Sequence, residues 1–300
     1  MRFLRVAAFL LALPAGAQVA GMTPEQRAAA CPSCAVWNVP EKPFRIHGNT
    51  YYVGTHGLAA ILVTSPAGHV LIDGALEESA PLIMANIRAL GFKVEDVKVI
   101  VNSHAHYDHA GGIGPIQQVS RARVLASAPS AVVMTRGTSG TDDPQYGLLL
   151  PYPPVSNVRV IADSETVNVG PLALTALFTP GHTRGGTSWT WWSCDEANHC
   201  MRAVYADSQT PVSADAFLFT KNDTYPTALK DFARGLALLD KSFCELLITP
   251  HPGASDFWQR VEARDRGDAS KLYDKDACHR LAAAGRAGVA KRVATETGKP

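Results

Sequence analysis

The chain has little net charge, no long hydrophobic run and no internal repeat, and each absence narrows what the protein can be. Its 28 Lys and Arg residues balance 27 Asp and Glu residues, so the basic excess typical of nucleic-acid-binding proteins is missing. The longest apolar run, residues 6–13, is too short to cross a bilayer as a helix. No strict repeat, low-complexity segment or separable linker is visible. What the chain does have is 300 residues with 46% hydrophobic content, which is ample for a large packed core.

The first 17 residues have the layout of a secretory signal peptide. Arg2 and Arg5 precede the apolar run, and Pro14 and the small residues 15–17 follow it. We therefore expect cleavage near Ala17, a periplasmic location if the source is a Gram-negative bacterium, and no membrane contact afterwards. Removing the two arginines lowers the number of basic residues from 28 to 26 against 27 acidic residues, which leaves the mature chain with a net charge near −1.

Export also changes the interpretation of the six cysteines, because an oxidising compartment favours disulfides over zinc–thiolate sites. By position they form three pairs, although the sequence leaves the connectivity open: Cys31 with Cys34, Cys194 with Cys200, and Cys244 with Cys278. We expect residues 18–300 to form a single domain. Its first part, about residues 18–44, is rich in Ala, Pro and small polar residues and is predicted to be an extended arm.

Short β-rich runs separated by turns predict an antiparallel sheet in the first part of the domain. These runs are residues 50–53, 60–64 and 69–73. Apolar residues at 83, 87 and 90, followed by Gly91, predict a helix over 81–90. The alternation continues with a strand at 97–101, a helix at 113–119, a strand at 124–126, a helix at 130–136 and a loop over 137–154.

The second half repeats this order. We predict strands at 158–161, 165–169, 172–177, 188–192 and 203–205, then a helix over 227–239 and a strand at 246–249. Sheets followed by helices, twice over, indicate an α/β fold with four layers, an αβ/βα sandwich.

The densest group of polar residues follows the predicted strand 97–101. His104, His106, Asp108 and His109 fall within six residues, and a loop at a strand end can bring several such side chains to one point. Imidazole and carboxylate donors without thiolate suit zinc, although manganese or iron(II) can occupy a similar set. Asp73 closes an earlier strand, as a strand-end cap or as a carboxylate that braces this loop.

Two further strand ends also finish on histidine. His182 and His251 each follow a Thr-Pro pair that restricts the backbone, and convergence with His104 at one sheet edge is the economical explanation. Six donors are too many for one tetrahedral ion. Two ions with three protein ligands each leave the open coordination position that a catalytic zinc needs. The histidines at 47, 56, 69, 199 and 279 lack such context and are interpreted as surface or packing residues.

Several sequence strings resemble the metallo-β-lactamase superfamily over nearly all of the mature chain. They are the cluster His104 to His109, the string Thr179-Pro180-Gly181-His182-Thr183 running into Gly185 to Trp189, Tyr205 to Ser208, and Thr249 to Ser255. Within that superfamily they are most similar to subclass B3 metallo-β-lactamases.

The resemblance implies two Zn²⁺ ions, one held by His104, His106 and His182 and the other by Asp108, His109 and His251. It implies that Trp37 and Gln145 line the pocket. Together with export, it also supports the disulfide Cys244–Cys278 and, less directly, Cys194–Cys200. Other hydrolases of the superfamily use a bridging aspartate, for which Asp207 is the candidate; because His109 fills the second site here, Asp207 is interpreted as structural. His56 and the pair Cys31 and Cys34 match no pattern of the family.

The expected function is zinc-dependent hydrolysis of the β-lactam amide bond of penicillins, cephalosporins and carbapenems, which confers antibiotic resistance. The nucleophile would be a metal-bound hydroxide oriented by Asp108, with no covalent intermediate. Ser208 and Thr210 are candidates to bind the substrate carboxylate, because few basic residues lie near the ligand strings. The alternatives are an exported dizinc lactonase or thioesterase of the same superfamily, or a zinc-binding protein without turnover. We expect a monomer whose only partner is its small-molecule substrate.

Overall fold

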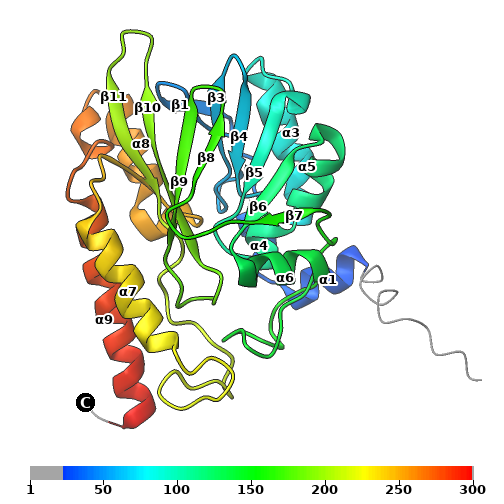
Figure 1. Cartoon of the computed structure of the whole chain (residues 1–300), viewed down its shortest axis with the longest axis vertical. Coiled ribbons are helices and arrows are strands. Elements are labelled where there is room, and N and C mark those ends of the chain that lie inside the picture. Colours follow the sequence, from blue (N-terminus) through cyan, green and yellow to red (C-terminus); the bar gives the residue numbers. More distant parts are fainter. Residues whose placement is uncertain (1–22, 299–300) are drawn as a thin grey trace, which may run out of the picture.

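Two β-sheets packed face to face, with helices on their outer sides, make up the computed structural model (Figure 1). The structure describes residues 23–298, so the predicted signal peptide lies outside the described residues. No helix within residues 23–298 combines the length and the apolar character needed to cross a membrane.

The first sheet has seven strands in sequential order. They are β1 (Phe44–His47), β2 (Thr50–Tyr52), β3 (Ile61–Ser65), β4 (Gly68–Ile72), β5 (Val97–Val101), β6 (Arg123–Ala126) and β7 (Val158–Val160). β1 to β4 are antiparallel, which confirms the predicted hairpins, and β4 to β7 are parallel. β7 was grouped with the second half from sequence; it instead pairs with β6, because the chain crosses to the second sheet only after it.

The second sheet has five strands in the order β12-β11-β10-β9-β8. They are β8 (Thr166–Val169), β9 (Leu172–Phe178), β10 (Thr187–Cys194), β11 (Cys200–Tyr205) and β12 (Leu246–Ile248). β8 to β11 are antiparallel, and β12 joins β11 in parallel.

Helices cover the outer face of each sheet. Beside the first sheet lie α3 (Ala80–Ala89), α4 (Tyr107–Ala110), α5 (Ile113–Ser120) and α6 (Ala128–Arg136), and the second sheet is covered by α7 (Ala228–Lys241) and α9 (Ala277–Thr297) (Figure 1). Helix α8 (Phe257–Asp265) instead adds Phe257 and Val261 to the core between the sheets, beside β1 and β2. Short 3₁₀ helices span Glu77–Ser79, Val94–Asp96, Pro252–Ser255 and Ala269–Lys271. These positions confirm the predicted four-layer sandwich.

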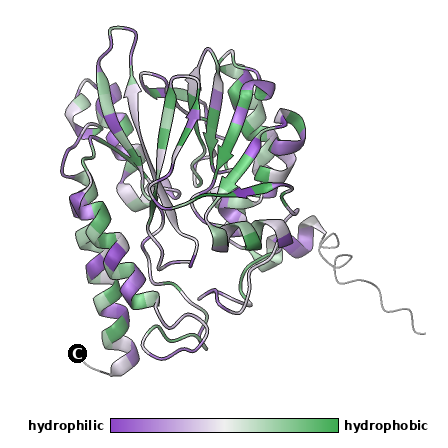
Figure 2. Cartoon of the chain, viewed as in Figure 1, coloured by the Kyte–Doolittle hydropathy of each residue, from purple (hydrophilic) through white to green (hydrophobic). Residues whose placement is uncertain are grey.

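Alternating burial along the strands explains the layers. Ile61 and Val63 of β3 face the second sheet, whereas Leu62 packs against the helices, and all three are fully buried. A strand buried on both faces is hydrophobic throughout, and Figure 2 shows this in the central strands, whereas α7 and α9 alternate hydrophobic and hydrophilic residues. On α7 the inward stripe includes Phe232, Leu236 and Leu239, the spacing of an amphipathic helix.

The segment predicted as an extended arm is partly helical instead. It forms α1 (Pro24–Ala30) and α2 (Cys34–Trp37) before β1 begins. The reason is local, because Thr23 and Gln26 form a reciprocal capping box and Pro24 occupies the first turn of α1.

All six cysteines are disulfide-bonded in the pairs expected from position. The bonds are Cys31–Cys34, Cys194–Cys200 and Cys244–Cys278. The second joins facing residues of β10 and β11, and the third ties the segment before β12 to α9.

Candidate metal centre

Four of the six predicted metal donors lie on one short segment that follows β5. His104 and His106 come from the loop, and Asp108 and His109 from the one-turn helix α4 at the edge of the sheets (Figure 1). All four are buried, with exposed fractions between 0% and 6%. Such polar groups are buried at a cost unless they are paired or bind a ligand.

Asp73, at the end of β4, holds this segment from below. Its carboxylate accepts hydrogen bonds from the backbone N–H and the hydroxyl of Ser103, at 2.7 and 2.6 Å, and from the amide of Asn102 and the hydroxyl of Tyr205. Asp73 itself has a φ of 61°, a left-handed conformation that turns its side chain under the loop. Of the two roles left open by the sequence, the brace is the one observed.

The second sheet supplies the other two histidines. His182 follows β9, and His251 follows β12. Gly181, just before His182, has a φ of +142°, and a Cβ at this position would lie 2.5 Å from Cγ of Phe232. Only glycine fits there, so the backbone that presents His182 is closely specified.

The donor atoms of these residues lie close together. Ligand atoms of His104, His106 and His182 all lie within 4.8 Å of one another, and so do those of His104, Asp108 and His109. Nε2 of His251 is 3.3 Å from Oδ2 of Asp108, the same distance as Nε2 of His109. All six predicted donors therefore converge across the two sheets.

Two carboxylates orient the first pair of imidazoles from behind. Oδ1 of Asp207 lies 2.7 Å from Nδ1 of His104, and Oδ2 of Asp143 lies 2.9 Å from Nε2 of His106. With the shared proton on Nδ1, the Nε2 lone pair of His104 points into the cluster, where it has no hydrogen-bond partner. Asp207 therefore lies behind His104, a candidate ligand.

His182 is oriented by the backbone. Its Nδ1 donates to the carbonyl oxygen of Thr210 at 2.8 Å, which leaves Nε2 as the donor atom; the amide of Gln145 lies 3.4 Å from that nitrogen. The roles of Asp143 and of the Thr210 carbonyl were missed from the sequence. Asp143 lies in a loop without periodicity, and a carbonyl carries no sequence signal.

Burial and mutual charge keep His104, His182 and Asp108 in the forms that bind metals, whereas the carboxylate of Asp143 outweighs burial and raises the pKa of His106. Burial, together with the neighbouring imidazoles, lowers the pKa of His182 to about 3 and that of His104 well below its usual value. Burial acts to raise the pKa of Asp108, but His109 and His251 outweigh it and hold that pKa well below its usual range. Neutral imidazoles and an ionised carboxylate are the species that coordinate cations.

A cavity of about 240 Å³ opens onto this cluster. The four sequence-predicted substrate contacts, Trp37, Gln145, Ser208 and Thr210, all lie in its wall, and Leu148, Leu149 and Val212 add apolar surface that the sequence did not indicate. Among the described residues, the cavity wall contains no Lys or Arg. A ligand anion there would meet hydroxyl, amide and imidazole groups.

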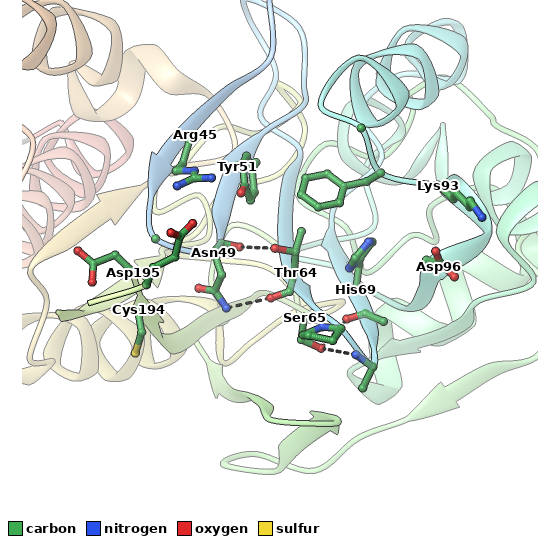
Figure 3. Close-up of a pocket in the computed structure, with 17 residues that line it drawn as sticks. Arg45, Asn49, Tyr51, Thr64, Ser65, His69, Lys93, Asp96, Cys194 and Asp195 are labelled. Carbon is green, nitrogen blue, oxygen red and sulfur yellow. Dashed lines mark hydrogen bonds between the residues drawn. The ribbon is translucent and has the colours of Figure 1, made fainter. Parts of the chain in front are cut away.

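A larger cavity of about 670 Å³ lies at the opposite end of the strands (Figure 3). It is bounded by the β3–β4 turn, the tip of the β10–β11 hairpin and residues 91–93. None of the six candidate metal donors lines it. The larger of the two cavities is therefore not the one that opens onto the candidate metal donors.

The fold and the buried donor cluster at the edges of two αβ layers define a metal-dependent hydrolase architecture. A family model described as the metallo-beta-lactamase superfamily matches residues 54–192. The solved structure of Rm3 metallo-beta-lactamase is 51% identical, with a TM-score of 0.87, and the match covers 89% of this chain and 99% of that one. The chain belongs to the metallo-β-lactamase superfamily.

Within the superfamily, the chain is similar to subclass B3 enzymes. MEM-A1, a subclass B3 metallo-beta-lactamase from a soil metagenome library, is 45% identical with a TM-score of 0.85 over 87% of this chain and 99% of that one. Among curated proteins, the N-acyl homoserine lactonase AttM of Agrobacterium fabrum is 30% identical over 153 residues. That match covers 42% of this chain and only 56% of the lactonase.

Proposed function

We propose that the chain is a zinc-dependent β-lactamase that hydrolyses the amide bond of penicillins, cephalosporins and carbapenems in the periplasm, as a monomer. The observation that carries this proposal is the convergence of six donors, five of them buried, beneath an open cavity, in a chain 51% identical to Rm3 metallo-beta-lactamase. A periplasmic location is supported by the predicted signal peptide and by three disulfides, which form in oxidising compartments.

The donor set fits two zinc ions. Nε2 of His104 is buried without a hydrogen-bond partner, as expected of an atom that coordinates a cation, and His109 offers one ligand atom from two ring nitrogens that are likewise unpartnered. His104, His106 and His182 would hold one ion, and Asp108, His109 and His251 the other. A zinc pair supplies a water with a pKa lowered to about 7 and polarises a carbonyl oxygen.

The chain's own residues would then position the substrate. The hydroxyls of Ser208 and Thr210 would donate to the carboxylate that a β-lactam carries beside its ring nitrogen. Trp37 packs 5.2 Å from the His251 ring and offers a flat apolar wall. Asp108, ionised by its histidine neighbours, would accept a hydrogen bond from the attacking water and fix its direction.

No covalent acyl intermediate is required in this mechanism. Within the described chain, the hydroxyl of Ser208 donates to no histidine or carboxylate, so it lacks the base that a serine nucleophile needs. Serine-directed inhibitors should therefore leave the activity intact, and intact-protein mass spectrometry should detect no acylated protein during turnover.

A hydrolysis panel tests the proposal. Purified mature protein, with about two zinc ions per chain by metal analysis, is given a penicillin, a cephalosporin, a carbapenem, an N-acyl homoserine lactone and an acyl thioester. We expect β-lactam turnover that chelation abolishes, and a loss in Asp108→Ala that is far larger in kcat than in KM. Lactone cleavage without β-lactam turnover would instead favour the lactonase alternative, which the similarity to AttM makes the second candidate.

The substrate contacts can be tested separately. A hydrogen bond to a charged acceptor contributes about 1.5–3 kcal/mol, so Ser208→Ala/Thr210→Ala should raise KM by about tenfold or more. The matched control is Ser270→Ala/Thr297→Ala, which removes two exposed hydroxyls outside the cavity. Equal KM values in both double variants would contradict a role for Ser208 and Thr210.

A further inference from the structure

The disulfide Cys31–Cys34 closes the shortest loop of the three and is the one without an evident role in stability. Its cysteines are three residues apart, in the sequence Cys31-Pro32-Ser33-Cys34, against separations of 6 and 34 for the other two bonds. The constraint that a disulfide places on the unfolded chain grows with loop length, so this bond restricts little. The two-residue spacing is also that of thiol–disulfide exchange motifs.

This disulfide contacts the segment that carries the metal donors. The hydroxyl of Tyr107 donates to Sγ of Cys31 at 3.3 Å. Tyr107 stands between His106 and Asp108 in the sequence and lines the same cavity. Tyr107 thus links Cys31 to the segment that carries the candidate metal donors.

The other cysteine begins the helix that ends in Trp37. α2 runs from Cys34 to Trp37, and the Trp37 ring packs against that of His251. α2 has no fully buried residue, and only its two ends, Cys34 and Trp37, pack against the core. The disulfide holds its start, whereas its end is held by the packing of Trp37 and by hydrogen bonds from Thr55 and Gly57 to the Trp37 carbonyl.

A reagent can reach this disulfide from outside. A cavity of about 300 Å³, separate from the one over the donors, is lined by both cysteines together with Pro32, Arg27 and Tyr107. Cys34 is partly exposed, and Pro32 and Ser33 between the cysteines are exposed. By contrast, Cys244 and Cys278 are 0% and 1% exposed.

We propose that Cys31–Cys34 is a thiol–disulfide exchange site for dithiols. Its redox state determines how firmly Trp37 is held in the wall of the substrate cavity. A thiolate of the dithiol attacks Sγ of Cys34, the S–S bond breaks, and the electron pair leaves on Sγ of Cys31, where the Tyr107 hydroxyl stabilises it. The second thiol of the reagent then attacks the mixed disulfide and releases Cys34. The dithiol is oxidised to a disulfide, and the two cysteines take up two electrons and two protons.

The effect on substrate rests on the proposed function, whereas the exchange itself does not. Opening the bond releases the start of α2 and lets Trp37 move away from His251. Substrate binding should weaken more than the chemical step, because the donor segment keeps its brace at Asp73.

The experiment uses the variant Cys194→Ser/Cys200→Ser, which leaves only the short and the buried disulfides. Metal-free protein is incubated with dithiothreitol, free thiols are alkylated, and the peptides are identified by mass spectrometry. We expect Cys31–Cys34 to open at least tenfold faster than Cys244–Cys278, and Tyr107→Phe to slow that opening several-fold. Hydrogen exchange of residues 34–39 should rise on reduction while the central strands stay protected.

The zinc-loaded protein supplies the second readout. Cys31→Ser/Cys34→Ser in the same background should show a KM several-fold higher and a kcat near that of the parent. Equal opening rates for the two disulfides, or unchanged exchange over residues 34–39 after reduction, would overturn the proposal. A protein that hydrolyses no β-lactam would defeat the proposed function alone, because the thiol and hydrogen-exchange measurements use metal-free protein.

Discussion

The disulfide Cys244–Cys278 should stabilise this fold more than either of the other two disulfides. Its cysteines have a sequence separation of 34 and enclose β12, His251 and α8, and both are fully buried. In the chain-entropy model such a loop is worth about 3.8 kcal/mol at about 25 °C, against about 2.2 kcal/mol for the loop of Cys194–Cys200. The difference arises from loop length alone.

Paired alanine variants measure this contribution. Cys244→Ala/Cys278→Ala and Cys194→Ala/Cys200→Ala are unfolded in urea as metal-free proteins, because a bound metal would add its own stabilisation. We expect the first pair to lose about 1.6 kcal/mol more than the second. Loss of the longer link should also weaken binding of the second zinc equivalent, because His251 lies inside the released loop.

Two outcomes would refute this reasoning. If the two variants lose the same free energy, loop length does not govern the stabilisation. If both thiols at 244 and 278 are free in protein purified without a reducing agent, the link itself is absent, and peptide mapping under non-reducing conditions decides this point.

Three further predictions concern the metal centre. Asp207→Ala should weaken zinc affinity by about 10–100-fold, measured by competition with a chromophoric chelator, because His104 loses its orienting carboxylate; an unchanged affinity would contradict that role. Gly181→Ala should lower stability by about 1–3 kcal/mol, because the new methyl group meets an aromatic ring, whereas Gly253→Ala, which meets nothing within 4 Å, should be neutral in the same thermal melt. Removing zinc with a chelator should lower the melting temperature, and added zinc should restore it; identical melts would count against a tightly bound ion.

Hydrophobic patterning predicted most of the fold. The helix predicted over 81–90 is α3 (Ala80–Ala89), and the strand predicted over 97–101 is β5 with the same bounds. These elements carry strong local signals, a 3.6-residue period closed by glycine and a run of four β-branched residues interrupted only by Lys98. The partner of β7 carried no such signal, because pairing is decided by where the chain crosses between sheets.

The sequence predicted the metal donors of the candidate site but not the groups that orient them. Donors such as His104 and His182 stand out because few other roles place histidines at strand ends. The groups behind them do not, since Asp143 lies in an irregular loop and Thr210 acts through its backbone carbonyl. Helix α1 (Pro24–Ala30) was missed because its capping box, Thr23 and Gln26, spans too few residues to outweigh a composition rich in small residues.

The division of the donors between the two sheets has a consequence for the lifetime of the protein. Four donors follow strands of the first sheet and two follow strands of the second, so each bound ion would link the two sheets. Free zinc at about 1,000 times its Kd would add about 4 kcal/mol to the free energy of unfolding. Metal starvation would then do more than stop turnover, because the unoccupied chain would unfold more often and be exposed to proteases, and activity lost in this way would not return when zinc does.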